Sequence, residues 1–270
     1  MGTSASSTGP GSNVSFDPPW LNDIPIGGGE EGNKNSETSP TGTPGLAPTA
    51  RFRAARRNMG VFVRNGDTRD LARAAGHYSR TGMGGAKNVA SRMRTSTRAA
   101  AGLGSFLQSV RDRTDLQINN WMDDLRAKNP SAQTVIDAIV SQIIPEGGSR
   151  DEESAKDSMA QALSELIDLN PDIDLLELND SQIWTLMQIF IGHEACNRMY
   201  ADIGQLFENA KYSPAKMVQR TNEMRGFLKN SVAAQLESMR QSFPNPTHQQ
   251  LEVLLNDAIQ MTFNVFEGEI

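Results

Sequence analysis

Apolar residues recur at three- and four-residue steps through much of the C-terminal half of this 270-residue chain. Such spacing places them on one face of an α-helix. The segments that show it most clearly are 135–143, 159–167, 217–239 and 251–266, and two further helices are expected over 115–128 and 180–209. No stretch alternates apolar and polar residues for long enough to indicate a strand. The sequence therefore predicts an all-α domain whose core is a helical bundle.

Polar residues and prolines mark where several helices should begin. Ser213-Pro214 supplies a cap followed by a proline at the first helical position. The pair Asn245-Pro246 is expected to open the last helix in the same way. Asp67 and Thr68 are the expected caps of a helix that reaches Tyr78.

Glycines divide the segment between 51 and 113 into short helical stretches. After Gly85, a helix rich in alanine and arginine is expected to run to about Val110. Gly102 and Gly104 would permit a bend or close packing within it.

The first fifty residues are mostly glycine, serine, threonine, proline and asparagine. They contain too few apolar residues to offset the entropy lost on ordering, so we expect a long disordered Gly/Ser/Pro-rich N-terminal tail. Residues 16–26 are an exception, because they mix apolar residues with prolines around Trp20. This stretch is either a peptide that docks in a groove of a partner or a linker that contains a tryptophan.

The net charge changes sign along the chain. It is −4 over residues 1–50, +11 over 51–113 and −13 over 114–270. We divide the chain accordingly into a flexible N-terminal tail with a modifiable terminus, a basic helical segment and an acidic helical bundle. The basic segment either packs on its acidic neighbour or binds an outside polyanion.

The basic segment holds eleven arginines between residues 51 and 98, which could neutralise nucleic-acid phosphates. The aromatic residues that would stack on bases are sparse there, namely Phe52, Phe62 and Tyr78. Docking on an acidic protein surface would use the same arginines. The candidate residues for partner docking or polyanion binding are Trp20, Arg51, Arg53, Arg56, Arg57 and Arg80.

Two patterns indicate chemistry only weakly. His193 and Cys196 lie three residues apart on an expected helix, as a metal pair or a thiol–imidazole dyad would require. No second cysteine, CxxC or HExxH completes a zinc site, so the two residues are expected to belong to a half-buried helix face. We therefore expect no catalytic residue, no metal and no cofactor of the chain's own. The stretch 80–87 resembles a glycine turn that holds phosphate at a helix N-terminus. It lacks a preceding strand and the P-loop spacing, which favours a helix–loop–helix turn.

The start of the chain has a distinct chemistry. Methionine aminopeptidase tolerates only small residues in second place, so it should remove Met1 and leave a free amine on Gly2. No side chain obstructs that amine, and a pKa near 8 leaves a usable neutral fraction at pH 7. Met-Gly-x-x-x-Ser, with Ser6, also matches the N-myristoylation pattern. The terminus is therefore either a site of modification or an ordinary unstructured start.

The chain contains one cysteine, which excludes an internal disulfide, and no secretory signal or membrane-spanning stretch is evident. These features predict a cytoplasmic protein that does not enter a membrane.

Three stretches resemble the QatB components of bacterial Qat anti-phage defence systems. They read MGTSASSTGPGS over 1–12, LAPTARFRAARRNMG over 46–60 and DLARAAGHYSRTGMGGAKNVASRM over 70–93. The resemblance does not extend to the residues between 14 and 45, and across the acidic region it concerns architecture only.

The resemblance implies a non-enzymatic adaptor that works beside a P-loop ATPase-like protein, a TatD-like nuclease and a QueC-like enzyme of the QatC type. The QueC-like partner, in which ATP and zinc are expected, would bind the chain and join 7-deazaguanine to Gly2. Thr3 and Ser4 would lie beside Gly2 in the partner's active site. One alternative is a non-catalytic scaffold or nucleic-acid-binding module that uses residues 51–98. Another is an enzyme that uses His193 and Cys196.

Overall fold

The computed structural model describes residues 50–144, 148–204, 212–240, 243 and 246–270. Within these ranges the regular elements are helices and no strand occurs, which confirms the predicted all-α class. The helical unit comprises Phe52–Ile270. None of the described helices is long and apolar enough to cross a membrane.

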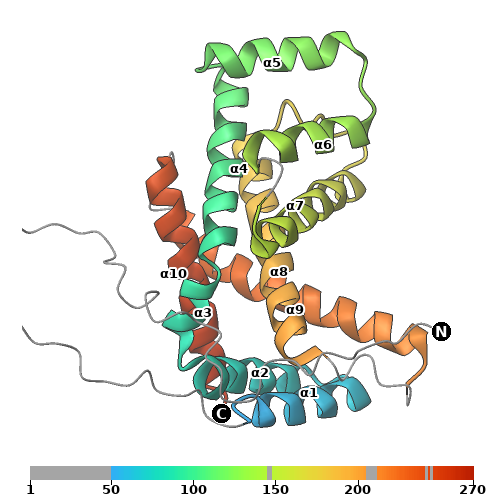
Figure 1. Cartoon of the computed structure of the whole chain (residues 1–270), viewed down its shortest axis with the longest axis vertical. Coiled ribbons are helices and arrows are strands. Elements are labelled where there is room, and N and C mark those ends of the chain that lie inside the picture. Colours follow the sequence, from blue (N-terminus) through green and yellow to red (C-terminus); the bar gives the residue numbers. More distant parts are fainter. Residues whose placement is uncertain (1–49, 145–147, 205–211, 241–242, 244–245) are drawn as a thin grey trace, which may run out of the picture. The chain divides into compact units, whose positions relative to one another are not determined.

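The helices are named in chain order in Figure 1. They are α1 (Arg53–Asn65), α2 (Thr68–His77), the π-helix η2 (Tyr78–Met83), α3 (Ala86–Arg92), α4 (Arg94–Asp112), α5 (Leu116–Ala127), α6 (Ala132–Ile143), α7 (Arg150–Leu169), α8 (Asp180–Ile203), α9 (Pro214–Arg240) and α10 (His248–Glu267).

Helix α8 is central to the core. It packs against α9, α7 and α4, and its buried residues, such as Trp184, Phe190 and Met199, point to several sides of the helix. A helix that is apolar on several faces is typical of an element surrounded by others. The second hub is α10, which contacts α2, α3, α4 and α9 and lies alongside α4 in Figure 1. Helices of the basic segment and of the acidic region thus contribute to one hydrophobic core.

Most helix starts follow the capping residues expected from the sequence. The Asp67 side chain accepts a hydrogen bond from the Arg69 backbone amide at 2.9 Å and caps α2. The last helix differs from the expectation, because it begins at His248 rather than directly after Asn245-Pro246. Thr247 is its cap and forms a reciprocal capping box with Gln250, which satisfies two backbone amides at once.

The helix expected from Gly85 to about Val110 is interrupted. Helix α3 ends at Arg92 and α4 begins at Arg94, with the buried Met93 between them at φ −94° and ψ 14°. The break is therefore at Met93 and not at the glycines. Gly104 instead provides close packing, since a Cβ there would lie 2.5 Å from the Met187 sulfur.

Candidate functional site

The residues expected at the modified terminus, Gly2, Thr3 and Ser4, lie outside the described residues, as does Trp20. The remaining candidates belong to the basic segment and are described below from α1 onward.

Helix α1 has a buried face and an arginine face. Its buried residues include Met59, Phe62 and Val63, whereas Arg53, Arg57 and Arg64 are exposed. These arginines are four and seven residues apart, so they fall within about 40° of one another around the helix, opposite the buried side. They form one row along the solvent side of α1.

A second row follows on α2 and η2. Helix α2 is joined to α1 by Gly66 and Asp67, and the two helices pack against each other. Arg73 on α2 and Arg80 on η2 are exposed. Arg69 begins the row and lies 3.5 Å from its own capping residue, Asp67. We call Arg53, Arg57, Arg64, Arg73 and Arg80 the arginine face.

Not every candidate arginine is on that face. The half-buried Arg56 donates a hydrogen bond through Nη2 to the backbone carbonyl of Asp202 at 3.0 Å, and its guanidinium lies 6.0 Å from the centre of the Phe52 ring. Its side chain therefore connects α1 to the end of α8. Arg51 is half-buried and also has a contact within the chain. Of the arginines singled out from the sequence, Arg53, Arg57 and Arg80 are the ones left open to a partner.

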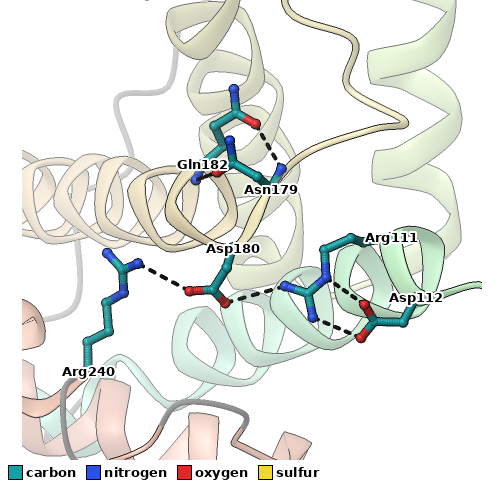
Figure 2. A network of polar contacts seen from close by, with 6 residues as sticks. All are labelled: Arg111, Asp112, Asn179, Asp180, Gln182 and Arg240. Atoms are coloured by element: carbon teal, nitrogen blue, oxygen red, sulfur yellow. Dashed lines mark hydrogen bonds and ion pairs between the residues drawn. The ribbon is translucent and has the colours of Figure 1, made fainter.

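Part of the basic segment does pair with its acidic neighbour. Figure 2 shows Asp180, at the start of α8, between two arginines from other helices. It lies 3.4 Å from Arg111 of α4 and 3.1 Å from Arg240 of α9, and Arg111 also pairs with Asp112 at 2.7 Å. This network joins three helices. It does not reach the arginine face, whose five members have no acidic partner among the described residues.

The aromatic residues between 51 and 98 belong to the core. Phe62 and Tyr78 are buried, and Phe52 is 9% exposed and stacks on Tyr78 with ring centres 5.6 Å apart. The Tyr78 hydroxyl donates to the Asp202 carboxylate at 2.8 Å, and burial together with that carboxylate raises the pKa of Tyr78 well above its usual value. None of these three rings is open for stacking on a nucleobase.

The stretch 80–87 is a helical connection. It comprises the end of η2, Gly84 in the left-handed conformation at φ 79°, Gly85 at φ 115° and the first residues of α3. The preceding element is a helix, which agrees with the helix–loop–helix interpretation and not with a P-loop.

His193 and Cys196 do not form a dyad. His193 is buried, and its Nε2 lies 2.7 Å from the Glu165 carboxylate, which also accepts from Lys229. Burial lowers the pKa of His193 in spite of that carboxylate. Cys196 is also buried, and burial raises the pKa of its thiol to about 11. A neutral, buried thiol is a poor nucleophile and a poor metal ligand.

The described residues contain no group of three potential ligands that could hold a metal ion.

The sequence did not reveal a buried polar cluster around Glu194. This fully buried carboxyl group accepts hydrogen bonds from Ser96 of α4 at 2.5 Å and from Ser158 and Ser154 of α7 at 2.6 and 3.2 Å. Asn197 donates to Ser158 at 2.9 Å and extends the cluster. The cluster joins α4, α7 and α8 through hydrogen bonds at their shared interface. The presence of Glu194 in an otherwise apolar stretch of the sequence could have indicated a buried polar cluster. Its hydrogen-bond partners could not be identified, because they are distant in sequence.

Comparison with known protein families matches most of the helical unit to one described family. The family described as Qat anti-phage system associated protein QatB matches residues 84–266, which is more than half of the chain. No curated protein and no solved structure shows significant similarity to it. The matched range begins directly after η2 and extends from α3 into the last turn of α10, so it includes most of the helical core. On this match, the chain belongs to the QatB family of Qat anti-phage system proteins.

Proposed function

We propose that this component of an anti-phage system is a non-catalytic adaptor and the protein substrate of a QueC-like partner enzyme, which attaches 7-deazaguanine to the amine of Gly2. The observation that carries the proposal is membership of the QatB family, together with a start, Met1-Gly2-Thr3-Ser4, that suits such an acceptor.

The chemistry of the available nucleophiles supports the terminal amine. At pH 7 an α-amine with a pKa near 8 is about 10% neutral, whereas a lysine with a pKa near 10.4 is about 0.04% neutral. The only thiol, Cys196, is buried with a pKa of about 11. The terminal amine is thus the most reactive acceptor, by about 200-fold over an ordinary lysine in neutral fraction.

An amide is the bond that such an amine would form with a 7-carboxylated form of the base, since 7-deazaguanine itself has no carboxyl group. ATP in the partner would activate that carboxyl group as an acyl adenylate, with release of pyrophosphate. The amine nitrogen then attacks the carboxyl carbon, the C–N bond forms, the bond to AMP breaks, and the amine proton passes to a base. Every group except the amine belongs to the partner.

The test is intact-mass analysis of the chain co-expressed with its QueC-like partner. We expect the wild-type chain to lose Met1 and to carry a deazaguanine-sized adduct, which disappears when the partner is omitted. Gly2→Leu should retain Met1, because leucine is too large for the aminopeptidase, and should carry no adduct. Ser6→Ala is the matched control, since it removes the myristoylation pattern and should leave the adduct unchanged. An unmodified wild-type terminus beside an active partner would overturn the proposal.

A further inference from the structure

We propose that the arginine face binds the phosphate backbone of double-stranded nucleic acid. This inference goes beyond the proposed modification of Gly2, because it concerns a different part of the chain and a different ligand. The face consists of Arg53, Arg57 and Arg64 on α1, Arg73 on α2 and Arg80 on η2, all of them exposed.

No ion pair within the described part of the chain neutralises the charge of this face. Between residues 51 and 98 the acidic residues are Asp67 and Asp70. Asp67 caps α2, and Asp70 accepts a hydrogen bond from the Asn65 side chain at 2.9 Å, so both serve the turn between the two helices. No acidic side chain pairs with any of the five arginines. Unpaired guanidiniums on a rigid helical hairpin are suited to phosphate.

The spacing of the arginines suits a regular array of charges. Arg53 and Arg64 are eleven residues apart on α1, which corresponds to about 16 Å along the helix axis. A duplex carries one negative charge per about 1.7 Å of its axis when both strands are counted, so a duplex segment of that length carries about nine phosphates. The second row lies on α2 and η2, which pack directly against α1. Each row can therefore contact phosphates without reading any base.

The surroundings of the face distinguish a duplex from other acidic partners. Protein interfaces depend on apolar or aromatic anchors, yet no large apolar side chain is exposed between residues 50 and 113. The large apolar side chains that are exposed belong to the acidic region, namely Leu116, Leu169, Val218, Phe243, Val253, Met261, Val265 and Ile270. Single-stranded nucleic acid would need stacking rings, and Phe52, Phe62 and Tyr78 are in the core. These surroundings favour a contact in which the arginines bind the phosphate backbone of a duplex through charge alone.

The acidic region of the chain does not prevent such a contact. The carboxylates of residues 114–270 that lie nearest to it are engaged within the chain: Asp202 accepts from Tyr78, Glu267 accepts from Ser79, and Glu223 pairs with Arg220.

The test is fluorescence anisotropy of a labelled 30-base-pair duplex with the full-length chain, across a series of salt concentrations. Five phosphate contacts predict that log K falls with log salt with a slope of about −4.5. The variant Arg57→Ala/Arg73→Ala should flatten that slope by about 1.8 and weaken binding by about 60-fold at 0.1 M salt. Lys128→Ala/Arg150→Ala is the matched control, because it removes two exposed positive charges from the acidic region and should change affinity by less than about threefold.

Several results would overturn the proposal. The first is the absence of duplex binding at 50 mM salt with the chain at about 100 µM, the weak end of non-specific affinity. The second is that the two double variants weaken duplex binding equally. The third is that polyglutamate binds the chain as tightly as the duplex does, and the fourth is that a single strand of the same length binds more tightly than the duplex. Circular dichroism of each variant checks that its helices are intact. Because all four substituted side chains are exposed, we expect unchanged spectra.

Discussion

Replacement of Glu194 by alanine should destabilise the helical unit by about 3–5 kcal/mol. The carboxyl group accepts hydrogen bonds from Ser96, Ser158 and Ser154 at 2.5, 2.6 and 3.2 Å. Each such bond contributes about 1 kcal/mol net, and the serine hydroxyls would be left buried without their acceptor. The shorter side chain also leaves a cavity, which adds about 1–2 kcal/mol. Contacts among α4, α7 and α8 would weaken together.

The assay is urea unfolding followed by circular dichroism at pH 7.5. Glu194→Gln keeps the shape and one acceptor oxygen, so we expect a smaller loss of about 1–2 kcal/mol. Glu252→Ala on α10 is the control, because Glu252 is only half-buried and has no partner among the described residues. It should stay within about 0.5 kcal/mol of wild type. If Glu194→Ala proved no more destabilising than Glu252→Ala, the cluster would not hold these helices together.

Four further predictions concern burial and packing. Burial lowers the pKa of His193, so the unfolded chain binds a proton at this residue at a higher pH than the folded chain does. The free energy of unfolding should therefore decline below about pH 6.5. In a profile of urea midpoints against pH, His193→Gln should flatten this decline. With a pKa of about 11, Cys196 should react with iodoacetamide at pH 7.5 at least about 100-fold more slowly in the native protein than in urea, and equal rates would show that it is accessible. Gly76→Ala should destabilise the protein by about 1–3 kcal/mol, because its Cβ would lie 2.3 Å from the Phe266 carbonyl oxygen. Gly226→Ala meets nothing within 4 Å and should stabilise α9 by about 0.5–1 kcal/mol; thermal melts that reverse this order would contradict the packing of α2 on α10.

The helices were predictable because their apolar residues are periodic. Periodicity in α6, α7, α9 and α10 reflects a single buried face, which one segment of sequence is enough to reveal. The boundary between α3 and α4 was not predictable in this way. The glycines expected to permit a bend, Gly102 and Gly104, lie within α4, whereas the break lies at Met93, whose side chain is buried in the core.

In the basic segment, too, some features could be predicted from the sequence and others could not. Its charge is plain from composition, and the position of each arginine follows from the helical period once the buried face of α1 is known. Arg53 and Arg57 lie opposite Met59 and Phe62, whereas Arg56 is turned toward α8 and bonds to the carbonyl of Asp202. That partner is 146 residues away in sequence, so local pattern alone could not separate a structural arginine from an exposed one.

Buried polar contacts were the least predictable part. Glu194 and Ser96 are 98 residues apart, and a glutamate on a long helix is ordinarily exposed. His193 and Cys196 shared a helix and a spacing that favour a dyad. Their tertiary environment excludes one, because the imidazole pairs with Glu165 and burial raises the pKa of the thiol to about 11.

Tandem mass spectrometry of the N-terminal peptide, from chain purified with its QueC-like partner, tests the central claim most directly. The account predicts fragment ions that place a deazaguanine-sized mass on the Gly2 amine, in a peptide that has lost Met1. A peptide that begins with an unmodified Gly2, or an adduct that maps to an internal residue while the partner is active, would contradict it.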